Sequence, residues 1–159
     1  TMIYVEALTG DGGQVDVVNA GHCPPRILRQ EGPVERLSPG GLPLGVDGGE
    51  RYTDVPFALG PGDALVLYSD GLTEARRQTP DRMFGEGGLE QLLPQLRGLE
   101  AEEIGRRLVE AVDGFMNGER VEDDLSLIVL RRNPWSASAR AADLGRSATT
   151  PQAGRPAPR

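Results

Sequence analysis

The sequence contains no lysine and has little cysteine, histidine or aromatic side chain. Its 17 basic residues are all arginine, and its single cysteine, Cys23, follows its single histidine, His22. A lone cysteine cannot form an intramolecular disulfide, which excludes a small disulfide-stapled domain and favours a cytoplasmic protein. No apolar run approaches the roughly 18 residues of a membrane span. The N-terminus also lacks the basic-then-apolar pattern of a secretion signal, so we expect no membrane association.

Charge is distributed unevenly along the chain. Residues 133–159 carry four arginines and one aspartate, a net charge of +3, which leaves residues 1–132 with 13 arginines and 23 acidic residues, a net charge of −10. A body this acidic repels nucleic-acid phosphates, so we expect no nucleic-acid partner. Residues 133–159 are rich in Ala, Ser, Pro and Arg and lack a sustained apolar period. This composition predicts a disordered tail after one folded domain of residues 1–132.

Alternating apolar and polar residues predict a series of strands in the first half of the chain. The turns at 9–13 and 30–33 each separate two such runs, which indicates two hairpins. Residues 38–50 are too rich in Gly and Pro for a helix or a central strand and are predicted to form a loop. The continuous apolar run ALVLYS predicts a central strand that is covered on both faces. The strands are expected at residues 2–8, 14–20, 26–29, 34–37, 52–59 and 64–69.

The second half of the chain carries the helical patterns. Residues 71–84 are polar and irregular, and Pro80 interrupts any helix there. Two amphipathic helices follow, and Pro94 should break or kink the first of them. They are expected at residues 87–98 and 99–118, with Ile104, Leu108, Ala111 or Val112, and Phe115 on one face of the second, before a last strand at 125–132. Strands, then helices, then a returning strand indicate an α+β layered domain with a mainly antiparallel sheet.

Acidic residues flank two of the predicted strands. Asp70 follows the strand at 64–69, whereas Asp123 and Asp124 precede the strand at 125–132. If these strands are antiparallel neighbours, about 4.8 Å apart, the end of the first and the start of the second lie at the same edge of the sheet. Carboxylates that converge there repel one another, and a hard divalent cation such as Mg²⁺ or Mn²⁺ resolves that repulsion. A water acidified by such a metal would suit the hydrolysis of a phosphate ester.

Each of these residues also has a purely structural interpretation. Ser-Asp-Gly at 69–71 is a common turn, and an acidic pair before a strand suits a solvated sheet edge. His22 stands close to two prolines, which is typical of a structural hydrogen-bonding residue, and Cys23 is typical of a small buried hydrophobe. Composition alone therefore favours the turn over the metal site.

Five motifs occur in the order in which one known family carries them. They are NAGHCPP at 19–25, GLPLGV at 41–46, GDALVLYSDGLTEA at 62–75, FGEGGLEQLL at 84–93 and EDDLSLIVLRR at 122–132. Together they resemble the C-terminal portion of the bacterial metal-dependent protein phosphatases of the SpoIIE-like PPM class. The resemblance covers about residues 1–132 and raises the metal interpretation above the turn interpretation.

The resemblance implies a fold and a set of site residues. The implied fold is an αββα sandwich, in which two antiparallel sheets lie between helix layers and the metals lie at one rim. Asp70 matches an aspartate that family members use as a metal ligand. Of the acidic pair, Asp123 is the better match for the second ligand, and Asp124 is a supporting or alternative ligand. The residues implied to support the site are Gly71, Asn19, Gly21 and His22.

The resemblance also implies a metal-dependent serine/threonine protein phosphatase with two Mn²⁺ or Mg²⁺ ions in the complete domain. The implied substrate is a phosphorylated regulatory protein such as an anti-sigma-factor antagonist, and an upstream sensor domain is a further expected partner. The sequence departs from the family in lacking its N-terminal Gly-Asp strand and acidic Asp-x-x-Gly-His-Gly segment, which Asp11 does not replace. We therefore expect a truncated domain. The alternative is a catalytically incomplete remnant that acts as a regulatory protein-binding module.

Overall fold

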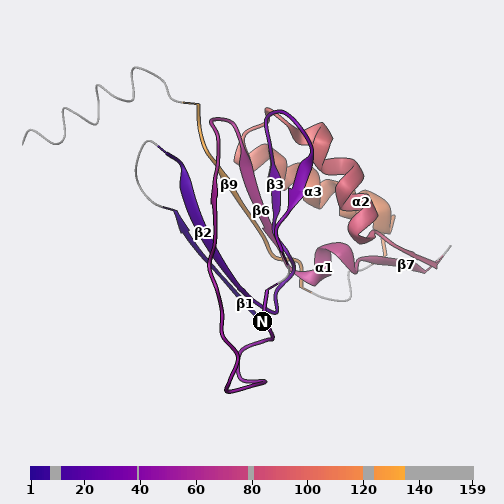
Figure 1. The fold of residues 1–159 in the computed structure, drawn as a ribbon. Coiled ribbons are helices and arrows are strands. Elements are labelled where there is room, and N and C mark those ends of the chain that lie inside the picture. The colour runs from indigo at the N-terminus through magenta and orange to yellow at the C-terminus, as the bar shows by residue number, and fades with distance from the viewer. Residues whose placement is uncertain (8–11, 39, 79–80, 120–123, 135–159) are drawn as a thin grey trace, which may run out of the picture.

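The computed structural model describes residues 1–7, 12–38, 40–78, 81–119 and 124–134. Two antiparallel sheets pack face to face, and helices cover the outer face of one of them (Figure 1). This is the α+β architecture with antiparallel sheets that the sequence predicts. The predicted disordered tail lies outside the described residues, apart from Asn133 and Pro134.

The first sheet has the strand order β1-β2-β5. Its strands are β1 (Met2–Ala7), β2 (Gln14–Ala20) and β5 (Val55–Ala58). The hairpin of β1 and β2 is confirmed, with Tyr4 opposite Val18. Valines of β2 point towards the second sheet, whereas Tyr4 on the opposite face is 52% exposed. One face of this sheet is therefore part of the core, and the other face carries exposed apolar side chains.

The second sheet has the strand order β4-β3-β6-β9. Its strands are β3 (Arg26–Leu28), β4 (Val34–Arg36), β6 (Ala64–Tyr68) and β9 (Leu127–Arg131). Strand β6 is buried at every residue, as a central strand covered on both faces must be. Leu65 and Leu67 face the first sheet, and Val66 and Tyr68 face the helices. The antiparallel pairing of β6 with β9, on which the predicted metal site depends, is confirmed.

The helical layer consists of α2 (Gly85–Leu92), the 3₁₀ helix η1 (Leu93–Leu96) and α3 (Ala101–Met116). The predicted effect of Pro94 is confirmed, because the α-helix ends at Leu92 and continues as a 3₁₀ turn around the proline. The long helix buries four residues against the second sheet, and Met116 takes the place predicted for Phe115. These four are Ile104, Leu108, Val112 and Met116.

The prediction that residues 71–84 are irregular is wrong. They form the short helix α1 (Asp70–Thr73) and a separate hairpin of β7 (Arg76–Gln78) and β8 (Asp81–Met83). The hairpin strands are short and polar, which is why they show no apolar period. An ion pair between Arg76 and Asp81 at 2.5 Å joins the two strands. Pro80, which was expected to interrupt a helix, lies outside the described residues.

None of the helices in the described residues has the length and hydrophobicity needed to cross a membrane.

Candidate metal centre

The end of β6 and the start of β9 are joined beyond their last ladder pair, Tyr68 with Leu127. The Ser69 backbone N–H donates to the Ser126 carbonyl at 2.9 Å. The Ser69 hydroxyl donates to the Asp124 carbonyl at 2.9 Å and accepts from the Ser126 backbone N–H at 2.9 Å. Ser69 therefore fixes the backbone of Asp124 at the end of the sheet where the neighbouring residue Asp70 emerges.

Asp70 begins helix α1 and has an exposed side chain. Its carboxylate accepts a hydrogen bond from the Gly71 backbone N–H at 3.1 Å, and its carbonyl accepts from the Glu74 backbone N–H at 2.7 Å. The Thr73 hydroxyl also donates to this carbonyl, at 3.2 Å. The backbone of Asp70 is thus fixed by the helix, while its carboxylate faces outward at the rim.

The structure brings Asp70 and Asp124 to one rim, but Asp123 lies outside the described residues. Within the described part of the chain, no group of three or more His, Cys, Asp or Glu side chains lies close enough to hold a metal ion. The two described carboxylates are hard oxygen donors at the exposed end of a rigid sheet, which is the donor chemistry that Mg²⁺ and Mn²⁺ prefer. The donor chemistry of Asp70 and Asp124 suits a divalent cation, and their role as ligands stays a prediction.

The NAGH loop between β2 and β3 is closed by its own side chains. The Asn19 amide donates to the His22 carbonyl at 3.0 Å, and its oxygen accepts from the His22 backbone N–H at 2.8 Å. The His22 ring lies 3.2 Å, Nδ1 to Oγ1, from the Thr1 hydroxyl. Asn19 is buried, so this pair of bonds also satisfies a polar side chain that would otherwise be costly to bury.

Cys23 connects this loop to the rim. Burial raises the pKa of the Cys23 thiol, and the nearby negative charges of Asp70 and Glu74 raise it further. An electrostatic effect of this kind requires the cysteine to lie near the two carboxylates. The loop that contains Asn19 and His22 therefore approaches the same end of the second sheet as Asp70.

Comparison with known proteins identifies the family. The family described as Stage II sporulation protein E (SpoIIE) matches residues 1–133. The chain belongs to the SpoIIE family. The chain is also 30% identical over 133 residues to the phosphoserine phosphatase RsbU of Bacillus subtilis. This alignment covers 83% of the chain and 38% of RsbU. It is 31% identical over 121 residues to protein IcfG of Synechocystis sp., in an alignment that covers 76% of the chain and 19% of IcfG. The chain thus spans well under half the length of these relatives.

Solved structures of bacterial phosphatase domains share the fold. The phosphatase domain of SpoIIE from Bacillus subtilis matches with a TM-score of 0.64 and 19% identity, over 85% of this chain and 57% of that domain. The SiaA-PP2C domain of Pseudomonas aeruginosa matches with a TM-score of 0.65 and 18% identity, over 75% of this chain and 46% of that domain. The predicted fold, a sandwich of the metal-dependent phosphatase type present in part, is confirmed.

Two features of the rim were missed by sequence reasoning. The sequence indicates only a turn at Ser69, whereas in the structure Ser69 holds the two strand ends together. The sequence assigns no role to the GLPLGV motif, and the structure shows that this motif packs on the NAGH loop. The Gly41 backbone N–H donates to the Asn19 carbonyl at 3.1 Å, and a Cβ on Gly21 would lie 2.6 Å from Pro43. Small residues in both motifs were the signal available in the sequence.

Proposed function

We propose that this chain supplies the C-terminal part of a metal-dependent phosphatase site that hydrolyses phosphoserine or phosphothreonine on a regulatory protein. One observation carries the proposal. Ser69 joins the ends of β6 and β9 and thereby brings Asp70 and Asp124 to one rim. Membership of the SpoIIE family, whose relatives include a phosphoserine phosphatase, supports the same chemistry.

The residues that would hold Mn²⁺ or Mg²⁺ are Asp70 and Asp123, with Asp124 as an alternative or supporting ligand. When bound, such a cation supplies positive charge for phosphate oxygens and an acidified water. The protein's own contribution is position. The short helix α1 fixes the Asp70 backbone, and the Ser69 hydroxyl fixes the Asp124 backbone, so that both residues are held at one rim before a metal or substrate arrives.

The proposed substrate is a phosphorylated protein in the cytoplasm, and the kinship with RsbU favours an anti-sigma-factor antagonist. A pocket of about 310 Å³ beside the NAGH loop gives room for a segment of such a protein. Its lining includes Asn19, Pro25, Gly41, Arg51 and Tyr52. The acidic body argues against nucleic acid as a substrate, because 23 acidic residues outnumber 13 arginines before residue 133.

The activity is tested on the chain completed with the N-terminal part of the phosphatase domain, by measuring phosphate released from a phosphoserine-containing protein with Mn²⁺ and, in parallel, with excess EDTA. The proposal predicts release with Mn²⁺ that EDTA abolishes and that Asp70→Asn removes. Release that is equal with EDTA, or unaffected by Asp70→Asn, would contradict it. The substitution replaces an exposed carboxylate by an isosteric amide, so the fold should not change.

A second candidate function is a regulatory module that binds a phosphoprotein without hydrolysing it. The observation that favours it is that the described residues contain no group of three metal-binding side chains. Under this alternative, the chain binds the phosphorylated protein in a pull-down or calorimetric titration and releases no phosphate with Mn²⁺. Hydrolysis in the assay above would exclude it.

A further inference from the structure

Arg26 is a charged residue in the interior of the protein. It begins β3 opposite Val66 of β6, and its side chain is only 1% exposed. A buried guanidinium is costly unless it is paired, and burial accordingly lowers the pKa of Arg26. Replacing a buried ion pair by apolar side chains of similar volume is often neutral for stability. The position of Arg26 therefore calls for an explanation other than stability.

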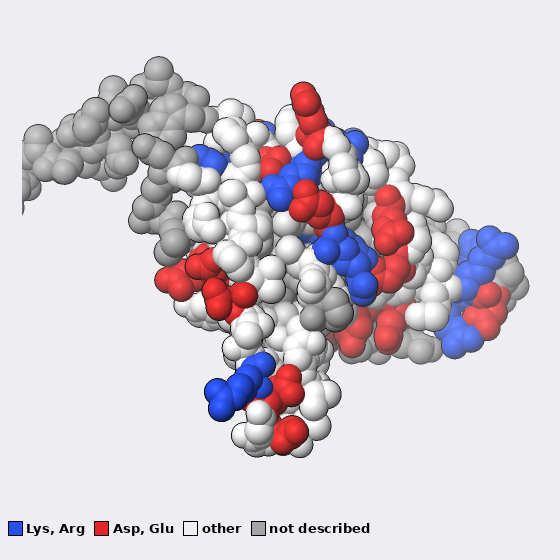
Figure 2. All heavy atoms as spheres, in the orientation of Figure 1, with Lys and Arg blue, Asp and Glu red and all other residues white. Residues whose placement is uncertain are grey.

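The partners of Arg26 lie on helix α2. Its guanidinium forms an ion pair with Glu86, and a second oxygen, from Glu90, lies 3.9 Å away. The Tyr68 hydroxyl donates to the other oxygen of Glu86 at 3.5 Å. Figure 2 shows acidic side chains gathered over α2 beside basic side chains of the sheet edge. Glu86 thus links the sheet to the helix through both an arginine and a tyrosine.

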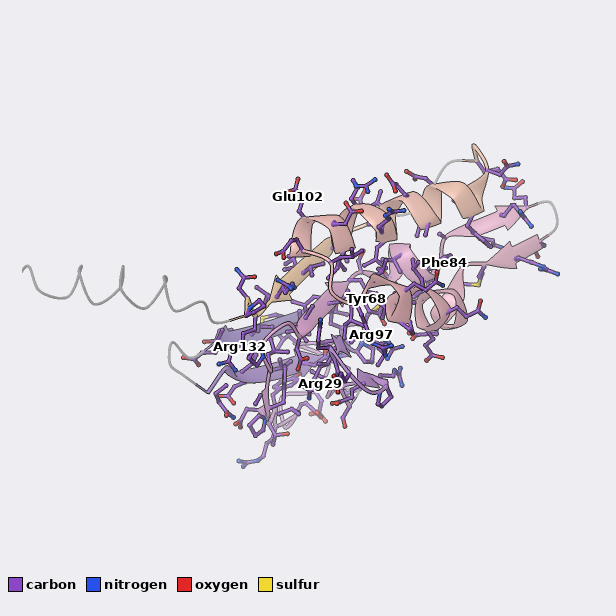
Figure 3. The ribbon with its side chains drawn as sticks, turned by 90° about the horizontal axis from the view of Figure 1, so that it is seen from above. Arg29, Tyr68, Phe84, Arg97, Glu102 and Arg132 are labelled. Atoms are coloured by element: carbon purple, nitrogen blue, oxygen red, sulfur yellow. The ribbon has the colours of Figure 1, made fainter. Side chains whose placement is uncertain are left out.

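Tyr68 is the last residue of β6 and stands two positions before Asp70. Figure 3 shows Tyr68 between the second sheet and the helical layer. Helix α1, which begins at Asp70, contacts α2, and Leu72 and Leu89 are fully buried in the same cluster. The orientation of α2 therefore affects the position of Asp70 in two ways. One is through Tyr68, in the strand that precedes Asp70, and the other is through Leu72, in the helix that Asp70 begins.

We infer that Arg26 and Glu86 are positioning residues, whose ion pair fixes α2 against the end of β6 and thereby sets the place of Asp70 at the rim. In this role the ion pair acts through Asp70 and not on a metal or substrate directly. Only one consequence of this inference rests on the proposed function, namely that metal binding weakens when the ion pair is removed. The placement of the rim itself is measured separately.

The first measurement is amide hydrogen exchange at Leu72 and Glu74. Their backbone N–H groups donate to the carbonyls of Ser69 and Asp70 and so report on the start of α1. In the double variant Arg26→Leu/Glu86→Leu, exchange at these two amides should rise by about tenfold, while that of β6 stays at its wild-type rate. Arg26→Lys keeps the charge and should remain within about threefold of wild type.

The matched control is Arg29→Leu/Glu35→Leu. Arg29 follows β3, and it pairs with Glu35 at 2.7 Å and with Asp63 at 2.8 Å. This pair lies at the other end of β3, so its loss should lower the melting temperature without changing exchange at Leu72 or Glu74. Unchanged exchange in the Arg26 double variant, or an equal rise in the Arg29 control, would overturn the inference. If the double variant does not fold, Glu86→Gln is measured in its place, because the Glu86 side chain is 44% exposed and its replacement should be tolerated.

The second measurement is Mn²⁺ binding to the same variants, followed by the electron paramagnetic resonance signal of free Mn²⁺. The Arg26 double variant should bind at least about fivefold more weakly than wild type, and the Arg29 control should bind equally. Equal binding by the Arg26 double variant would contradict a positioning role at the metal. If the wild-type chain binds no Mn²⁺, the metal proposal fails, whereas the exchange rates still decide whether Arg26 and Glu86 position the rim.

Discussion

The Ser69 hydroxyl donates a hydrogen bond to the Asp124 carbonyl at 2.9 Å, although the two residues are 55 positions apart. The same oxygen accepts from the Ser126 backbone N–H at 2.9 Å. The Ser69 side chain thus links the ends of β6 and β9 by hydrogen bonds beyond their last ladder pair. The acidic residues next to it, Asp70 and Asp124, are held at one rim as a result.

Ser69→Ala should weaken the link between the ends of β6 and β9 without unfolding the protein. Removing a hydroxyl that makes two hydrogen bonds should lower the free energy of unfolding by about 1–3 kcal/mol, because the partner groups lose their bonds. Urea unfolding measures this loss. Exchange at the Ser126 amide should also rise, because that N–H donates to the missing oxygen.

Two variants control for this substitution. Ser69→Thr keeps the hydroxyl and should retain most of the stability. Ser126→Ala should be near neutral, since Ser126 contributes its backbone to the junction. A Ser69→Ala protein as stable as wild type, with the Ser126 amide still protected, would show that the Ser69 hydroxyl does not hold the strands.

Gly21→Ala should be more destabilising than Gly32→Ala. Both glycines have positive φ, 72° and 93°, so either alanine adopts an unfavourable backbone at a cost of about 1–2 kcal/mol. Only at Gly21 would the new Cβ meet another residue, Pro43, at 2.6 Å. Thermal unfolding of the two variants isolates this contact. Equal losses would mean that the NAGH and GLPLGV loops do not need to pack closely.

Asp63 should make the stability of the protein depend on pH in acid. Burial would raise the pKa of Asp63, but hydrogen bonds from Arg29 and from the backbone of Gln30 and Gly60 outweigh it and lower the pKa. Because the folded pKa lies below the unfolded value of about 3.9, the stabilisation is present above that pH and is lost as pH falls through the folded pKa. Urea unfolding at a series of pH values below about 5 measures it.

The matched variant is Asp63→Asn, which removes the titrating group. It should be less stable than wild type at neutral pH by about 1–3 kcal/mol, because Arg29 loses a charged partner at 2.8 Å. Its stability should also vary less between neutral and acidic pH. A variant with the same acid dependence as wild type would assign that dependence to other carboxylates.

Leu108→Ala and Val109→Ala test the packing of α3. Leu108 is fully buried against the second sheet, whereas the next residue, Val109, is 37% exposed. Truncation of the buried leucine should cost about 2–5 kcal/mol in denaturant unfolding. Truncation of Val109 should cost well under half of that. Similar losses at the two positions would mean that the helix does not present this face to the sheet.

Much of the fold was predictable because the pattern of apolar residues and prolines in the sequence reflects which residues are buried and where a helix changes. The run ALVLYS is apolar at every position that the two flanking layers bury, and Pro94 changes the helix type where it occurs. The hairpin of β7 and β8 was missed because Arg76–Gln78 and Asp81–Met83 bury little, and so leave no apolar period for the sequence to show.

The candidate site was predictable only in outline. The positions of Asp70 and Asp124 at the ends of two strands suggested that both lie at one edge of the sheet, and the pairing of β6 with β9 explains why they do. The contributions of Ser69 and Arg26 depend on contacts between residues far apart in sequence, at 2.9 Å to Asp124 and as an ion pair to Glu86. Local patterns do not encode such contacts.

The proposed phosphatase site requires that the rim formed by Asp70 and its neighbours binds a divalent cation. The most direct test is a Mn²⁺ titration, followed by electron paramagnetic resonance, of the wild-type protein, Asp70→Asn and the control Asp47→Asn. Asp47 is an exposed loop residue whose oxygen accepts from the Gly49 backbone N–H, a bond that asparagine also makes. We predict Mn²⁺ binding that Asp70→Asn abolishes and Asp47→Asn preserves, whereas equal Mn²⁺ affinity in all three proteins would show that Asp70 is not a metal ligand.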